Sequence, residues 1–126
     1  MCIRDSYNNA EKQGRAVARS MLGATDPYDY IYTFWSDQYE DKLEYAGYAT
    51  NWDRFVVRGS LRERMFLGFY VVDGVVAAAV GLNRGGDPEL DEDSEMAAAA
   101  RLVGLRAPVP ADALTNEDID LWSLAR

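Results

Sequence analysis

Alternating apolar positions in the middle of the chain predict a group of antiparallel strands. The strongest pattern covers 64–72 and 75–82, two apolar runs that are separated only by Asp73 and Gly74. Both turn residues tolerate positive φ, so the pair predicts a type I′ β-hairpin. Weaker patterns predict strands over 42–49 and 53–59, and 30–36 is aromatic and extended in character. We therefore expect an antiparallel sheet of three to four strands.

Helical spacing flanks this region. Residues 9–22 repeat apolar and small side chains at i, i+3 and i+4, and Gly23 follows as a candidate C-terminal residue. Asp87 and Pro88 are typical of a helix N-cap and first turn, which predicts a second helix to about Leu102 that ends at Gly104. Its inward positions would be Met96, Ala99, Ala100 and Val103. Tail residues expected to pack back onto the sheet are Ile119, Leu121, Trp122 and Leu124. This order indicates an α+β fold with a helix on one face of the sheet.

Composition narrows the function classes. The chain has 126 residues, 48% of them hydrophobic, which suits one domain with a real core. The net charge of −8 disfavours a nucleic-acid or anionic-membrane partner. There is no His and the one Cys is Cys2, so zinc sites and Cys/His nucleophiles are not expected, and neither is any other metal site. No apolar run approaches the roughly 20 residues of a membrane span. A reducing, cytoplasmic setting in a bacterium is the simplest expectation.

The first six residues, MCIRDS, do not continue the pattern that follows them. They match the translation of a transposon adapter used in preparing sequencing libraries. We expect residues 1–6 to derive from that adapter, with the reading frame cut upstream and Cys2 carrying no redox meaning. An ordinary disordered N-terminus is the alternative.

Known catalytic signatures are missing, since the sequence has no G-x-G-x-x-G, no phosphate-binding loop and no metal-ligand spacing. The segment FWSDQY, from Phe34 to Tyr39, stands out instead. Taken alone, it is more typical of core packing followed by a turn at Ser36 and Asp37, where Asp37 would bond backbone N–H groups. An isolated enzyme would need reactive groups of its own, which favours a part of a larger protein.

Three segments together resemble one family. FWSDQY is followed by the small pair Ala46–Gly47, by the V-x-R-G strand from Val56 to Gly59, and by the hairpin FLGFYVVDGVVAAAVGLNR. Upstream, NNAEKQGRAVARSMLG is similar to the helix that ends an FAD-binding domain. In this combination the chain resembles the C-terminal domain of FAD-dependent ferredoxin and rubredoxin reductases, which include putidaredoxin-reductase-like and apoptosis-inducing-factor-like proteins. Good resemblance runs from Asn8 to Arg84.

The resemblance implies a fragment of an electron-transfer flavoprotein. NAD(P)H would deliver hydride to FAD, and FAD would pass single electrons to a ferredoxin-type iron–sulfur protein or a rubredoxin. Residues 7–29 would be the tail of the FAD-binding domain with its linker, and 30–126 the reductase C-terminal domain. Both nucleotide-binding domains would lie outside this chain, so the fragment alone is not expected to be active.

The resemblance also implies site residues. Trp35 matches a tryptophan near the flavin and nicotinamide rings, with Phe34 beside it. Glu44 falls where apoptosis-inducing-factor-like members place a glutamate that binds the nicotinamide carboxamide. Gln13 and Gly14 lie on the helix that approaches FAD, where a glycine permits close backbone approach. The competing interpretations are a core tryptophan for Trp35 and a solvated strand residue for Glu44.

Charge supplies the remaining candidates. The basic residues Arg54, Arg58, Arg62 and Arg64 form a concentration that could steer an acidic partner, although arginines on a solvated strand edge and loop are the more ordinary interpretation. The acidic run 87–95 suits a helix start better than a metal site. Two rival functions stay open: a stand-alone protein-interaction module without catalysis, and an apoptosis-inducing-factor-like or nitrite-reductase-associated oxidoreductase with another acceptor.

Overall fold

The computed structural model describes residues 7–88 and 90–125. The expectation about residues 1–6, including Cys2, lies outside them. The elements in chain order are α1 (Tyr7–Met21), β1 (Thr33–Gln38), β2 (Asp41–Gly47), β3 (Arg54–Ser60), β4 (Met65–Val72), β5 (Val75–Leu82), α2 (Glu95–Leu105), α3 (Ala111–Thr115) and α4 (Leu121–Leu124). Among these described residues, no helix has the length and apolar character that a membrane crossing requires.

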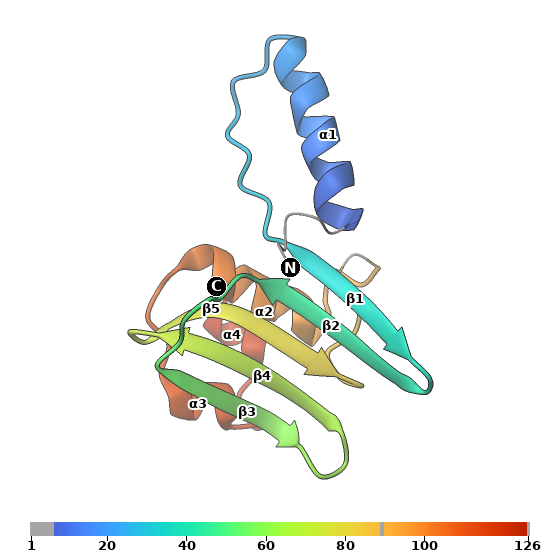
Figure 1. Ribbon diagram of the computed structural model, residues 1–126. Helices are drawn as coiled ribbons and strands as arrows, with labels where there is room; N and C mark the ends of the chain where they lie inside the picture. The colour runs from blue at the N-terminus through green and yellow to red at the C-terminus, as the bar shows by residue number, and fades with distance from the viewer. Residues whose placement is uncertain (1–6, 89, 126) are drawn as a thin grey trace.

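The five strands form one antiparallel sheet in the order β1-β2-β5-β4-β3 (Figure 1). The α+β class is confirmed, but the expected three to four strands are too few. The additional strand is β1, whose polar Ser36 and Asp37 had suggested a turn. They pair instead with Leu43 and Lys42. The chain reverses after Gln38, at Tyr39 and Glu40, where Tyr39 takes a positive φ of 58°. An edge strand tolerates polar side chains because it is partly solvated, so its apolar pattern is weak.

The β4–β5 hairpin is confirmed as predicted. Asp73 and Gly74 have φ values of 50° and 80°, as a type I′ turn requires at both central positions. Strand β5 has the expected bounds, and β4 begins one residue later than expected. The two strands lie in the middle of the sheet, where they pair with each other and with β2 and β3.

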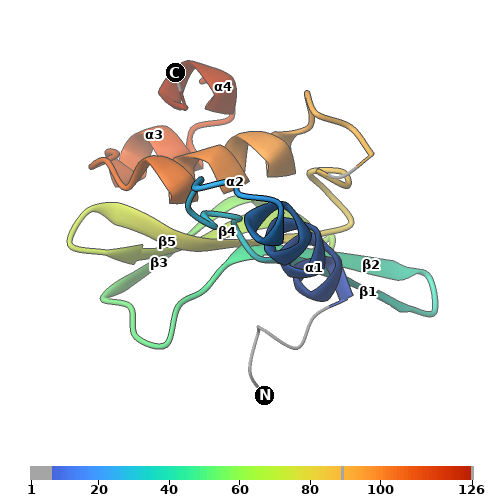
Figure 2. The ribbon, with the colours of Figure 1, turned by 90° about the horizontal axis from the view of Figure 1, so that it is seen from above.

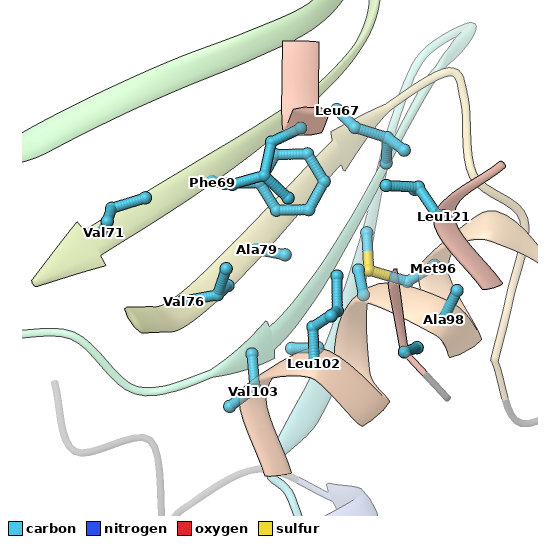
Figure 3. Packing of buried hydrophobic residues seen from close by; sticks show 14 residues of the cluster. Leu67, Phe69, Val71, Val76, Ala79, Met96, Ala98, Leu102, Val103 and Leu121 are labelled. Carbon is cyan, nitrogen blue, oxygen red and sulfur yellow. The ribbon is translucent and has the colours of Figure 1, made fainter. Parts of the chain in front are cut away.

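Helices α2, α3 and α4 all cover the same face of the sheet (Figure 2). Alternate residues of the central strands point toward them and build the core, in which Phe69 and Leu67 from β4 meet Met96 and Leu102 from α2 (Figure 3). Of the predicted inward residues of α2, Met96, Ala99 and Val103 are buried and Ala100 is half-buried. The single covering helix of the prediction is therefore a layer of three.

The predicted start of α2 is wrong by seven residues, because the N-cap is Ser94 rather than Asp87. Asp87 and Pro88 lie in a loop in which the Asp87 carbonyl accepts from Leu90 and Asp91 and closes one turn only. The helix begins at Glu95, after Ser94, whose hydroxyl accepts from the Ala97 N–H as an N-cap. Successive carboxylates at 91–93 repel one another and aspartate is a poor helix former, which explains the delay.

The predicted end of α2 and the placement of the tail also change. Gly104 lies within α2, and the left-handed C-cap residue is Arg106, with φ 52°. In the tail, α3 packs on β3, and α4 packs mainly on α2. Leu121 is buried in the core, while Trp122 and Leu124 pack against it and Ile119 is half-buried.

Helix α1 projects away from the sheet (Figure 1) and contacts it at β1. Its N-terminal turn is held by polar contacts: Asn8 Nδ2 donates to the Thr33 hydroxyl at 3.1 Å, and the Tyr28 hydroxyl donates to Asn9 Oδ1 at 2.7 Å. The apolar residues farther along are exposed, including Val17, Met21 and Leu22. No described part of this chain covers the apolar face that the helical spacing of residues 9–22 had predicted.

Candidate functional site

Two of the candidate residues meet on the β1–β2 hairpin. Trp35 and Glu44 are directly opposite each other across these strands, so their side chains leave the same face of the sheet. The Trp35 side chain is 45% exposed, and the Tyr7 ring from α1 lies edge-on to it with ring centroids 6.5 Å apart. We call this region the Trp35 surface and define it by Tyr7, Trp35, Lys42 and Glu44. A flat, accessible indole of this kind can stack on a planar ring, whereas a core tryptophan cannot.

Glu44 is buried, with only 4% of its surface exposed, which excludes the solvated strand residue considered above. Lys42, two residues earlier on the same face, places Nζ 3.5 Å from Glu44 Oε1. At that distance the contact is an ion pair without a well-formed hydrogen bond, and Oε1 has no hydrogen-bond partner. Burial, followed by the nearby Asp87 carboxylate, raises the pKa of Glu44 to about 7, while Lys42 opposes the shift.

Phe34 points to the other face of the sheet. Its ring stacks on Tyr45 with centroids 5.0 Å apart and planes within 18°. The Tyr45 ring lies next to the Tyr70 ring, which contacts both Phe55 and Trp52. These five rings cross the sheet on the face without helices, and we call them the aromatic row. Phe34 and Trp35 are therefore neighbours in sequence whose side chains serve opposite faces.

Gln13 and Gly14 lie on α1 away from the Trp35 surface. Both are exposed, and a Cβ built at Gly14 would meet no atom within 4 Å. Six residues of helix separate Tyr7 from Gln13, a rise of about 9 Å. The described chain therefore leaves this part of α1 open and does not bring it to Trp35.

The four arginines do not form one cluster. Arg54 begins β3, whereas Arg62 and Arg64 lie in the β3–β4 turn at its other end, about 20 Å away along a strand of this length. Arg62 and Arg64 share their end of the sheet with the β1–β2 turn, and Arg64 bonds Asp41 at 2.8 Å. Arg58 is only 3% exposed, and its guanidinium donates to backbone carbonyls of the tail. We therefore leave Arg58 out of any partner-docking face.

A groove of about 1350 Å³ lies between residues 28–33 and α2. Its lining combines rings with cationic side chains, among them Tyr28, Tyr30, Tyr32, Tyr48, Arg101 and Arg106. The sequence pattern did not indicate this groove, because its walls come from segments about 70 residues apart. Lys42 and Tyr7 were not among the predicted site residues, although Lys42 and Glu44 lie two residues apart on a predicted strand and therefore share a face. In residues 7–88 and 90–125, no cluster of Asp and Glu side chains is arranged to hold a metal ion.

The fold and the site together define a class of protein: an α+β domain with an antiparallel sheet, helices on one face of it, and an exposed indole beside a buried carboxyl. The model of the family described as "Reductase C-terminal" matches residues 33–125. The chain belongs to this family, which confirms the resemblance inferred from FWSDQY and the strands after it.

Individual relatives agree. The chain is 32% identical over 117 residues to putidaredoxin reductase of Pseudomonas putida, covering 93% of this chain and 26% of that protein. Among solved structures, the ferredoxin reductase for the CYP199A2 system of Rhodopseudomonas palustris is similar with a TM-score of 0.80 and 31% identity, over 96% of this chain and 28% of that one. A covalent putidaredoxin reductase–putidaredoxin complex matches with a TM-score of 0.78 and 31% identity, over 92% of this chain and 26% of that one. The chain thus spans about a quarter of the length of these relatives.

Proposed function

We propose that this chain is the C-terminal part of an oxidoreductase that passes electrons from NAD(P)H through FAD to a ferredoxin-type iron–sulfur protein or a rubredoxin. Family membership supports this, as does the likeness to a reductase crystallised covalently with putidaredoxin. The observation that carries the proposal is the pairing of an exposed Trp35 with a buried Glu44 on one face of the β1–β2 hairpin.

The residues present fit a flavin and a nicotinamide. Trp35 offers stacking area, and the Glu44 oxygen without a hydrogen-bond partner can bind a carboxamide N–H when ionised. When bound, FAD supplies the exchange between a two-electron hydride donor and one-electron carriers. Phe34 stiffens the same strand from the opposite face by stacking on Tyr45. In this proposal the hairpin forms one wall of the flavin pocket.

Helix α1 and the linker, residues 7–29, are the tail of the FAD-binding domain in this proposal. The exposed apolar residues Val17, Met21 and Leu22 then pack inside that domain. Gln13 and Gly14, open in the described chain, face the cofactor there. The nucleotide-binding domains of the proposed reductase, which this chain does not contain, would also cover the groove between residues 28–33 and α2.

A chimera tests the role of Trp35. Residues 33–125 replace the matching domain of the Pseudomonas putida reductase, and the product is expected to retain FAD that NAD(P)H reduces. Trp35→Ala in this chimera should weaken FAD retention up to about tenfold, because stacked aromatic pairs contribute roughly 0.5–1.5 kcal/mol. Flavin released on gel filtration gives the measure.

Trp52→Ala is the matched control, since Trp52 is half-exposed in the aromatic row on the other face. A folded chimera whose flavin retention is unchanged by Trp35→Ala, or is equally weakened by Trp52→Ala, contradicts the proposed pocket wall.

Partner docking is tested at the β3–β4 turn. Arg62→Glu with Arg64→Glu in the chimera is expected to raise the KM for an acidic iron–sulfur partner about 3- to 10-fold at low salt, because reversing a rim charge mainly slows association. The difference should shrink at high ionic strength. Arg54→Glu, at the far end of β3, is the control, and an equal effect there would remove the turn from the docking face.

A second candidate, a stand-alone interaction module, is favoured by the aromatic row, which no described helix covers. The isolated chain separates the two. Retention of FAD or NADH by residues 7–126 alone contradicts the proposal of an incomplete reductase, and recruitment of a protein through the aromatic row without flavin supports the module.

A further inference from the structure

A buried carboxyl group stands at the edge of the Trp35 surface without a complete set of partners. Glu44 is 4% exposed, and its Oε1 atom accepts no hydrogen bond. Burying an ionised carboxylate in this way is costly, and folds normally supply two or three donors to compensate. Here neither neighbouring strand supplies a donor to Glu44 Oε1. The residues opposite Glu44 are Trp35 on β1 and Gly81 on β5, and Gly81 has no side chain.

The charges around Glu44 do not fix it in one protonation state. Lys42 on its own strand approaches it, but the Lys42 side chain is 48% exposed and water screens it. Asp37 on β1 and Asp87 in the β5–α2 loop both oppose ionisation of Glu44. The acidic residue of the α2 first turn, Glu95, is held by Arg84 at 2.9 Å. Two carboxylates against one screened cation leave the neutral and ionised forms close in free energy, with a pKa of about 7.

A reductase of the proposed kind needs a proton acceptor. A hydride carries two electrons and one proton from NAD(P)H to the flavin. Two one-electron carriers, each an oxidised iron–sulfur protein or rubredoxin, then take one electron apiece and no proton. One proton is therefore left behind in every cycle and must reach water.

We infer that Glu44 is a proton-exchanging residue of the Trp35 surface, and that its carboxylate takes up the proton left after single electrons depart. In this step an N–H bond of the bound flavin would break as an O–H bond forms on the Glu44 carboxyl, and that O–H bond would later break as the proton passes to solvent beside the half-exposed Lys42. This inference rests on the proposed function for its place in a cycle. The exchange itself is a property of the described chain.

The exchange is measured without any cofactor. In the chain carrying Trp52→Phe and Trp122→Phe, Trp35 is the one remaining indole. A protonated carboxyl beside an indole quenches its fluorescence, so emission is expected to rise with pH with a midpoint near 7. Glu44→Gln should abolish this transition, and Glu44→Asp should restore one with a shifted midpoint, because a titratable group returns.

Carboxyl ¹³C shifts in the otherwise unaltered chain provide a second measurement that needs no tryptophan replacement. One glutamate signal should titrate near pH 7 and disappear in Glu44→Gln. A Glu44 signal that titrates below about pH 5.5, or a Trp35 transition that survives Glu44→Gln, overturns the inference. Loss of flavin retention in the chimera would contradict the proposed function but would leave this titration unchanged. Failure of the proposed function and failure of the Glu44 inference are therefore distinguishable.

Discussion

Replacing Arg58 by alanine is expected to lower the free energy of unfolding by about 3–5 kcal/mol, the usual cost of removing one partner from a buried charged network. Arg58 rises from β3 toward the helix layer and donates to the carbonyls of Asn116 at 2.7 Å and Ile119 at 2.6 Å, with longer contacts to Leu114 and Glu117. Its Nε lies 3.7 Å from a Glu95 carboxylate oxygen. Urea denaturation followed by circular dichroism measures the loss.

The loss should be specific to the guanidinium. Arg58→Lys keeps the charge but cannot present a planar fork to several carbonyls, so it should recover only part of the stability. Arg62→Ala, four residues later and exposed, is the matched control and should change the unfolding free energy by less than about 0.5 kcal/mol. A cost below about 1 kcal/mol for Arg58→Ala would show that water replaces the guanidinium at the tail carbonyls.

Glu44→Gln is expected to stabilise the chain above pH 7 by about 2–3 kcal/mol, and to leave it almost unchanged near pH 4.5. Folding raises the pKa of Glu44 from its ordinary value of 4.5 to about 7, chiefly through burial. Between these two values the folded chain holds a proton that the unfolded chain has lost. Stability therefore falls as pH rises through this window and stays at the lower level above it. Glutamine has no proton to lose and removes that loss.

Urea midpoints at pH 5, 6, 7 and 8 measure this difference. Glu40→Gln, an exposed carboxyl in the β1–β2 turn of the same hairpin, is the control, and its profile should stay parallel to that of the unaltered chain. If the stability profile of Glu44→Gln also runs parallel to that of the unaltered chain, this prediction is wrong. Lys42, whose Nζ lies 3.5 Å from Glu44 Oε1, would then compensate the buried charge fully.

The buried Arg58 also explains part of the sequence resemblance in physical terms. The V-x-R-G strand ends with Gly59, where φ is 107° and a Cβ would approach the Met65 carbonyl oxygen to 2.6 Å. Gly47, in the small pair Ala46–Gly47 earlier in the chain, is restricted in the same way, since a Cβ there would lie 2.6 Å from the Ala77 carbonyl oxygen. These motif positions hold the sheet and tail together. The site proposed for cofactor contact lies elsewhere, on β1 and β2.

Sequence alone determined the local features of this protein. Asp73–Gly74 between two apolar runs predicted the central hairpin, because turn geometry and strand alternation depend on neighbouring residues only. The segment FWSDQY with the strands that follow identified the family, since a motif is read in order along the chain. Both were confirmed.

Tertiary structure decided which side chains share a surface. Strand pairing set Trp35 beside Glu44 and turned Phe34 to the opposite face. It also separated Arg54 from Arg62 and buried Arg58 under the tail, although all three looked alike in sequence. Burial and opposing charge depend on residues distant along the chain, such as Asp87 near Glu44. Protonation and exposure follow from those long-range contacts, which local pattern does not encode.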